Sequence, residues 1–261
     1  MNTIDALKTY AGKNYVYLVS RGNKAIKEAL KFAKEKGKTK VLIPEEGGWL
    51  VYEQYPTELK MKLKRIKCRN AILDLSYLKE ELGRDAVLLV NSMPAYSTFE
   101  QMELLVNVCA RYGAMIINDA SGSVGTVHAR YGDVIVCSFG RWKPIEMGTG
   151  GFIASNEAFH VEEANIDELE LSKAIKERPE KTKRWSERVK KIKRDLSSLN
   201  VVHPESNGYV AIIKYKNESE KHQITLYCAD HDLVFTECPR YIRLQQPAIS
   251  IEVKQDGKIE D

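Results

Sequence analysis

Short apolar runs and amphipathic stretches alternate through the first 155 residues of the chain. The apolar runs are continuous, and hairpin turn signals do not join them. Such runs, alternating with helices, predict a mainly parallel sheet covered by helices on both faces. We expect seven strands, at Tyr15–Ser20, Val41–Pro44, Ala71–Leu75, Ala86–Asn91, Ala114–Asn118, Val134–Phe139 and Gly151–Ser155.

The pattern changes near Ile166, where a long helix is expected. Apolar residues recur there every three or four positions, and the lysines and arginines of 173–194 fall on the opposite face. The remaining elements are expected at Tyr209–Tyr215, Lys221–Asp230 (a helix), Leu233–Thr236, Tyr241–Leu244 and Ile249–Val253. The sequence therefore predicts an α/β large domain over 1–165 and a small α+β domain over 166–261, with a frayed polar tail at Lys254–Asp261.

Composition and charge narrow the class of protein. The net charge of +4 arises from many charges of both signs, and the basic helix has no accompanying nucleic-acid-binding motif, so no nucleic-acid partner is expected. No apolar segment is long enough to span a membrane, and no signal peptide is evident. The five cysteines lack metal or disulfide spacing, and the histidines lack metal spacing, which favours a cytoplasmic protein with reduced thiols and no metal.

Residues suited to chemistry follow the predicted strands, where parallel sheets bind ligands. Gly22 and Asn23 open a helix directly after a strand, which is an anion-binding arrangement. Trp49 follows the second strand, Asp119 follows the fifth, and Ser138 ends the sixth with Lys143 close behind. These types match pyridoxal phosphate: an amine for the aldehyde, a carboxylate for the ring nitrogen, donors for the phosphate, and an aromatic ring for stacking.

Four stretches in this order resemble a known family. Ser138–Gly151, which includes Lys143, is similar to the lysine signature of the DegT-like sugar-nucleotide aminotransferases, a branch of fold-type-I pyridoxal-phosphate enzymes. The other three are Ile117–Gly125, which resembles the aspartate motif, Arg21–Ala25, which resembles the phosphate loop, and Val41–Pro44 with Trp49, which parallels the strand and stacking aromatic. The chain resembles this family in a shortened form.

The resemblance implies a role for each residue. Lys143 would hold pyridoxal phosphate as a Schiff base and Asp119 would keep its ring nitrogen protonated, while Gly22, Asn23, Ser138 and Trp49 would bind its phosphate and ring. Arg243, from the small domain, would receive a substrate carboxylate. The implied protein is a homodimeric aminotransferase that takes a small-molecule amino donor and acceptor.

Other interpretations stay open at this point. Asp119 also suits a helix cap, and Arg243 suits a surface position on a strand. Gly122 stands where the family usually has a polar side chain that reaches the cofactor, which favours a non-catalytic protein of the same fold. A lyase or desulfurase on the same scaffold is a further alternative. A desulfurase needs a mobile cysteine, and Cys137 lies inside a predicted strand.

Overall fold

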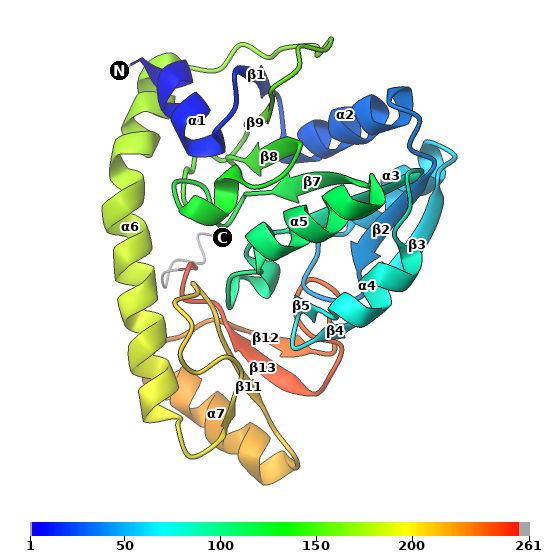
Figure 1. Ribbon diagram of the computed structural model, residues 1–261. Helices are drawn as coiled ribbons and strands as arrows, with labels where there is room; N and C mark the ends of the chain where they lie inside the picture. Colours follow the sequence, from blue (N-terminus) through cyan, green and yellow to red (C-terminus); the bar gives the residue numbers. More distant parts are fainter. Residues whose placement is uncertain (1, 256–261) are drawn as a thin grey trace.

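A seven-stranded sheet forms the centre of the larger part of the molecule in the computed structural model, which describes residues 2–255 (Figure 1). Its strand order is β1-β9-β8-β7-β6-β2-β3, and β9 alone runs antiparallel to its neighbours in this sheet. The strands are β1 (Tyr15–Val19), β2 (Lys40–Pro44), β3 (Lys62–Ile66), β6 (Ala86–Asn91), β7 (Met115–Asp119), β8 (Val134–Ser138) and β9 (Gly151–Ser155). The mainly parallel, seven-stranded sheet predicted from the sequence is confirmed.

Helices cover both faces of this sheet, which explains why its inner strands are continuously apolar. One face packs against α2 (Gly22–Glu35) and α3 (Val51–Glu58). The other face packs against α1 (Thr3–Ala11), α4 (Leu75–Glu81), α5 (Met102–Tyr112) and the first half of α6 (Glu168–Asp195). Alternate residues of a strand serve the two faces: Val41 and Ile43 of β2 face α2, whereas Leu42 faces the side of α4 and α5.

A second, antiparallel sheet packs below the first, with order β10-β11-β13-β12 (Figure 1). Its elements are β10 (Asn200–Val201), β11 (Ala211–Lys214), α7 (Glu218–Asp230), β12 (Phe235–Cys238) and β13 (Ala248–Ile251). The second half of α6 buries Trp185, Val189 and Ile192 against this sheet, as the apolar spacing predicted. Because α6 contributes to both cores, the division at residue 165 stays a prediction.

Two of the expected strands are wrong. Ile72–Leu73 (β5) pairs only with Cys68–Arg69 (β4) in a small hairpin, and the third parallel strand at this end of the sheet is instead β3. The sequence of β3, KLKRI, is mostly charged because the strand lies at the sheet edge and exposes most of its side chains. A search for apolar runs therefore passes over it.

Tyr241–Leu244 forms a turn rather than a strand. The Arg243 N–H group donates to the Arg240 carbonyl at 2.8 Å, which closes the turn. The turn is held against the loop after β2, where the Gly47 N–H group donates to the Tyr241 carbonyl at 2.7 Å. Bonds to a distant loop thus replace strand pairing, and they fix the position of Arg243 relative to the large sheet.

Candidate active site

The residues predicted from the strand ends line one cavity of about 460 Å³. The cavity lies at the carboxyl ends of the parallel strands. It is closed on its far side by residues that lie in or next to the second sheet, mostly in the turn before β13 and the segment after it. A volume of this order is typical of small-molecule sites. The predicted residues found in its wall are Gly22, Asn23, Trp49, Asp119, Ser138, Lys143 and Arg243.

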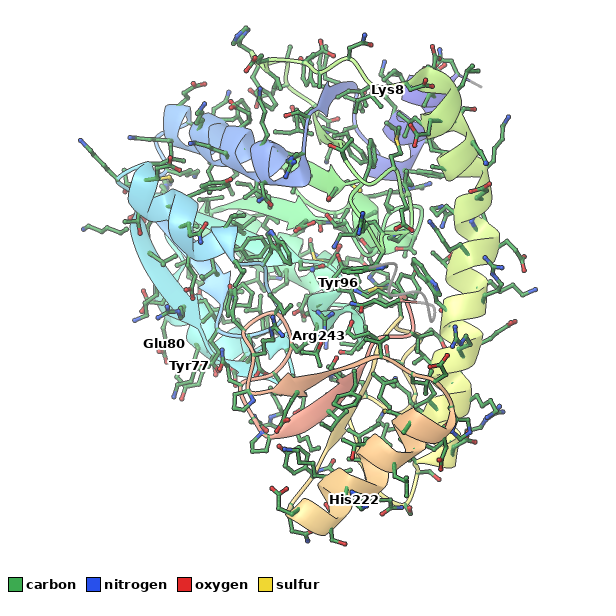
Figure 2. The ribbon with its side chains drawn as sticks, turned by 180° about the vertical axis from the view of Figure 1, so that it is seen from behind. Lys8, Tyr77, Glu80, Tyr96, His222 and Arg243 are labelled. Atoms are coloured by element: carbon green, nitrogen blue, oxygen red, sulfur yellow. The ribbon has the colours of Figure 1, made fainter. Side chains whose placement is uncertain are left out.

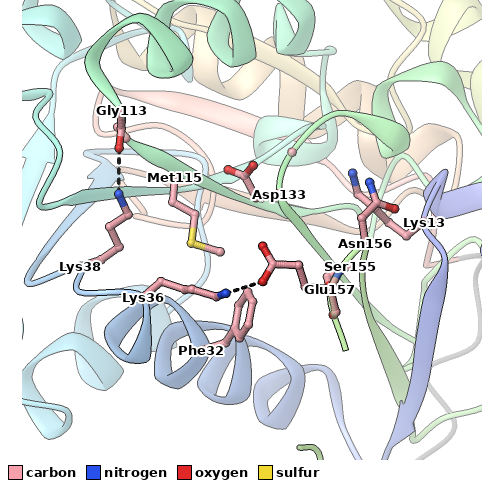
Figure 3. A pocket seen from close by; sticks show the side chains of 12 residues that line it. Lys13, Phe32, Lys36, Lys38, Gly113, Met115, Asp133, Ser155, Asn156 and Glu157 are labelled. Carbon is pink, nitrogen blue, oxygen red and sulfur yellow. Dashed lines mark hydrogen bonds and ion pairs between the residues drawn. The ribbon is translucent and has the colours of Figure 1, made fainter. Parts of the chain in front are cut away.

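A second cavity, of about 350 Å³, lies at the opposite edge of the sheet, beside the start of β7 and the end of β9 (Figure 3). Two of the lysines in its wall, Lys36 and Lys38, already have partners. Lys36 pairs with Glu157, and Lys38 donates to the carbonyl oxygen of Gly113 at 2.8 Å. The cavity at the strand carboxyl ends is therefore the candidate site.

Asp119 provides a buried carboxylate at the end of β7. Its side chain is only 4% exposed, and within residues 2–255 it forms no ion pair. Oδ2 accepts a 2.7 Å hydrogen bond from the hydroxyl group of Tyr52, and Oδ1 accepts a 3.0 Å bond from the Ser121 N–H group. Burial, followed by the charge of Asp119, raises the pKa of Tyr52 well above its ordinary value, so Tyr52 remains a donor. The carboxylate is thereby oriented but has no counter-ion among these residues.

Lys143 lies on the loop between β8 and β9 and reaches the same cavity. Its Nζ atom donates a hydrogen bond to the hydroxyl group of Tyr96, and it lies 5.7 Å from the centre of the Trp49 ring. The residue before it, Trp142, has a φ of 60°, in the left-handed region that side chains rarely adopt. Such backbone strain is concentrated at functional sites, and here it helps to turn Lys143 into the cavity.

Ser138 and the start of α2 form the end of the cavity suited to an anion. The helix begins without a side-chain cap, so its first N–H groups are not used by a capping residue. Gly22 is required here, because a Cβ atom on it would lie 2.4 Å from Cβ of Ser138. The Ser138 N–H group donates to Oγ of Ser121 at 2.9 Å, and its own Oγ accepts from Gly140 at 3.1 Å, which leaves the hydroxyl proton available.

Gly122 leaves space that the ring of Tyr96 fills. A Cβ atom at Gly122 would lie 2.9 Å from Cε1 of Tyr96 and 3.0 Å from Cβ of Met93. Tyr96 has a φ of 57°, and its carbonyl oxygen accepts hydrogen bonds from Tyr209 and Val210, so the segment that leads into β11 holds it in place. A phenol thus stands beside the position where the family usually has a different polar side chain.

Arg243 lines the cavity from the turn before β13 and forms an ion pair with Glu252. Figure 2 shows Arg243 close to Tyr96, near the middle of the molecule. Its Nε atom donates to Oε1 of Glu252 at 2.8 Å and its Nη2 atom to Oε2 at 2.6 Å. Burial opposes ionisation of Glu252, but the charges of Arg243 and Lys254 outweigh burial and lower the pKa of its carboxyl group to about 2. Nη1 donates to the Ile242 carbonyl at 2.9 Å.

Lys254 was expected in a frayed tail, and that expectation is wrong for this residue. Lys254 is 7% exposed and lines the cavity, with its Nζ atom 3.8 Å from the centre of the Tyr96 ring. The rest of the expected tail beyond Gln255 lies outside the described residues. The polar composition of the tail gave no indication that Lys254, which follows β13, is buried.

These residues fit pyridoxal phosphate. A buried carboxylate without a cation suits a protonated ring nitrogen, and an amine in the same cavity suits the aldehyde. An uncapped helix start beside a serine hydroxyl group suits a phosphate.

The sequence itself matches a family model. Residues 66–197, half of the chain, match the DegT/DnrJ/EryC1/StrS aminotransferase family, and this range includes Asp119, Ser138 and Lys143. The chain belongs to this family. It is therefore an aminotransferase, and its cofactor is pyridoxal phosphate, which the family uses. A second model, the MJ1341 family C-terminal domain, matches residues 179–257.

Several solved structures have the same fold as this chain. A 3-amino-5-hydroxybenzoic acid synthase matches 97% of this chain and 85% of its own, with 14% identity and a TM-score of 0.75. PseC of Helicobacter pylori, an aminotransferase involved in the biosynthesis of pseudoaminic acid, matches 96% and 84%, with 14% identity and a TM-score of 0.73. NtdA of Bacillus subtilis with bound cofactor PMP matches 98% and 74%, with 15% identity and a TM-score of 0.73. These likenesses confirm fold type I, and no curated protein matches the chain.

Two further observations concern the class of protein. Cys137 is fully buried in β8, and burial together with Asp119 raises the pKa of its thiol well above the ordinary value, which is the opposite of what a nucleophilic cysteine needs. None of the helices within residues 2–255 is both long and apolar enough to cross a membrane.

Sequence reasoning missed Tyr52, Tyr96 and Lys254. Tyr52 lies on α3, which carries no recognisable motif, and Lys254 follows a strand near the end of the chain. Tyr96 did have a signal: the unexpected glycine at 122 indicates that a neighbouring side chain occupies its space. Only a knowledge of the fold identifies that neighbour.

Proposed function

We propose that this chain transfers an amino group from a small amino donor, with Lys143 as the residue that binds pyridoxal phosphate covalently. The observation that carries the proposal is the convergence of Lys143 and the buried, cation-free carboxylate of Asp119 on one cavity. When bound, pyridoxal phosphate supplies an electron sink for the negative charge that develops at the amino-bearing carbon of a substrate.

The other residues of the cavity would bind and orient the cofactor. Asp119 would keep the ring nitrogen of the cofactor protonated, and Tyr52 orients the Asp119 carboxylate through its hydrogen bond. Ser138, Gly22 and Asn23 bind the phosphate at the start of α2, and Trp49 covers the ring. Trp49 is itself held by a 2.9 Å hydrogen bond from its Nε1 atom to Oδ1 of Asn23.

The Lys143 amine would remove the proton from the amino-bearing carbon of the substrate and return it. Tyr96 is its hydrogen-bond partner in the cavity. Burial raises the pKa of Tyr96 although the charge of Lys143 opposes this, so the phenol stays protonated at neutral pH and can donate to a neutral amine. Arg243 is the proposed residue for the donor carboxylate. Three of its five N–H groups are engaged by Glu252, Ile242 and their neighbours, and two remain.

Borohydride trapping tests the proposal. The protein loaded with pyridoxal phosphate should be yellow, and reduction followed by peptide mass spectrometry should find the cofactor on Lys143 and be blank for Lys143→Ala. Glutamate alone should then convert the absorbance to that of the amine form. If a broad panel of amino donors leaves the spectrum of the loaded protein unchanged, the proposed transfer is wrong. The expected homodimer stays a prediction, which light scattering of the loaded protein can check.

A further inference from the structure

The buried charges around Tyr96 do not balance. Arg243 is matched by Glu252 in a two-point ion pair, and Glu146 is matched by Lys181, whose Nζ atom lies 3.4 Å from Oε2. Lys254 is left with a distant contact of 3.9 Å to the oxygen of Glu252 that already pairs with Arg243. Lys143 and Asp119 line the same cavity without ion pairs to other residues of 2–255, and both are assigned to the cofactor. Lys254 is then the remaining buried charge in the cavity wall without a counter-ion of its own among the described residues.

Lys254 is held in place but is not saturated with hydrogen bonds. Its side chain is 5% exposed, and Nζ donates no hydrogen bond to another of residues 2–255. The face of Tyr96 supports the ammonium group from one side through a cation–π contact. An ammonium group has three N–H donors. A buried donor that lacks an acceptor costs free energy. Because the group lines the cavity, an anionic ligand can supply what the protein does not.

The position relative to Lys143 identifies which anion this is. Lys143 and Lys254 contact the same ring, at 4.6 Å and 3.8 Å from its centre, so both ammonium groups lie within one small molecule's reach of each other. The phosphate end of the cavity, at Ser138 and α2, has its own donors. An anionic group bound at Lys254 can therefore belong to the same molecule that reacts beside Lys143.

We propose that Lys254, with the free N–H groups of Arg243, forms the binding site for the carboxylate of an α-amino acid donor. This rests on the proposed function, because it takes Lys143 as the reacting lysine. Glu252 acts as a positioning residue that aligns Arg243 and does not contact the donor. The site comes from residues after 197, where the DegT/DnrJ/EryC1/StrS match ends and the MJ1341 C-terminal match continues.

Two inert amines of the same shape test the site. 2-Methylalanine and tert-butylamine differ by a carboxylate in place of a methyl group, and neither has a hydrogen atom on the reacting carbon, so the readout is equilibrium binding. Each amine is titrated into the protein loaded with pyridoxal phosphate, and its binding is followed by the absorbance of the cofactor. We expect Lys254→Met to weaken 2-methylalanine about 10- to 100-fold, the value of a charge-assisted hydrogen bond, and to leave tert-butylamine unchanged.

Matched variants complete the test. Lys254→Arg should retain most of the affinity for 2-methylalanine, and Lys216→Met, on the exposed surface of the same part of the chain, should behave as wild type. If Lys254→Met and wild type bind 2-methylalanine equally, and thermal melting shows that both are folded, the carboxylate site is wrong. The proposed function would not be affected by that result. Pyruvate added to the amine form of the protein tests whether the carboxylate belongs to the donor or to the acceptor. If Lys254→Met loses affinity for pyruvate alone, Lys254 binds the acceptor and the donor site is wrong. A protein that takes up no pyridoxal phosphate would overturn the proposed function, and this site with it.

Discussion

The hydroxyl group of Tyr52 donates a 2.7 Å hydrogen bond to Oδ2 of Asp119, and both side chains are buried. Tyr52 does not line the cavity, so it supports Asp119 from the protein side while the other face of the carboxylate stays open to a ligand. No helix begins directly after Asp119, so its bond to Ser121 closes a turn and is not a helix cap. The additional buried donor indicates that the carboxylate is built to be held in one orientation.

Asp119→Asn should leave pyridoxal phosphate bound but slow proton removal from the donor by roughly 100-fold or more, since an amide cannot keep the ring nitrogen protonated. Single-turnover conversion of the cofactor by glutamate measures this step. Tyr52→Phe provides the matched comparison: it keeps the charge and should slow the step less, while it lowers the free energy of unfolding by about 1.5–3 kcal/mol through the lost bond to a charged group. Equal rates for Asp119→Asn and wild type would limit Asp119 to a structural role in the turn after β7.

Gly122 and Tyr96 should be energetically coupled. Gly122→Ala places a methyl group 2.9 Å from the Tyr96 ring and should lower the free energy of unfolding by about 1–3 kcal/mol. In a Tyr96→Ala background the same change should cost much less, and denaturant titration of the four proteins gives the coupling. If the two changes have additive effects on the free energy of unfolding, the contact between Gly122 and the Tyr96 ring does not explain the glycine.

Tyr96→Phe removes only the hydroxyl group that bonds Lys143 and keeps the ring that supports Lys254. We expect the conversion of the cofactor by glutamate to slow about 10- to 100-fold. Binding of 2-methylalanine should change much less, because its carboxylate contacts do not involve the hydroxyl group. Tyr112→Phe, at an exposed position, is the control. A variant that loses affinity for 2-methylalanine and keeps its rate would reverse the two roles.

The core strands could be predicted from sequence because each is buried on both faces and therefore continuously apolar. The edge strand β3 could not, because exposed edge positions tolerate charge and erase the pattern. Tyr241–Leu244 has strand-like composition but becomes a turn, since bonds to the loop after β2 outweigh local preference. Local patterns fail where a contact with a distant segment decides the structure.

The same distinction applies to the site. Asp119, Ser138 and Lys143 stand at or just after strand ends, so the parallel sheet alone brings them together. Tyr96 depends on two consecutive residues in the left-handed region, Ala95 and Tyr96, and no sequence signal announces that turn. Lys254 depends on how the second sheet docks, which is a long-range property. Sequence therefore predicts the cofactor side of the cavity better than the substrate side.

Gly22→Ala tests the contact between α2 and β8. The new Cβ atom would lie 2.4 Å from Cβ of Ser138 and 3.0 Å from its Cα, and a strand backbone cannot move away cheaply. We expect the free energy of unfolding to fall by about 1–3 kcal/mol and cofactor affinity to fall with it. Adding Ser138→Gly should restore the stability but not the affinity, because the hydroxyl group is gone. If the double variant regains both, Ser138 does not bind the phosphate.

The contribution of Lys254 to the free energy of unfolding should depend on pH. Burial lowers the pKa of Lys254 well below its ordinary 10.5, Arg243 and Lys143 act in the same direction, and Glu252 and Glu146 oppose them. Between the folded-state pKa and 10.5 the unfolded chain binds more protons at this position, so the contribution of Lys254 to stability rises with pH. Lys254→Met lacks this rise.

At pH 7 the Lys254→Met protein should therefore have the higher free energy of unfolding, by about 1.4 kcal/mol for each unit by which the pKa is lowered. The gap should close as the pH approaches 10.5, and Lys216→Met should show no such trend. Denaturant titrations of the three proteins at several pH values measure this. An anionic ligand should reverse the order, because a carboxylate beside Lys254 stabilises the charged form that only wild type possesses. A methionine variant that is less stable than wild type at every pH, by a constant amount, would show that Lys254 is a structural cation already satisfied by Glu252.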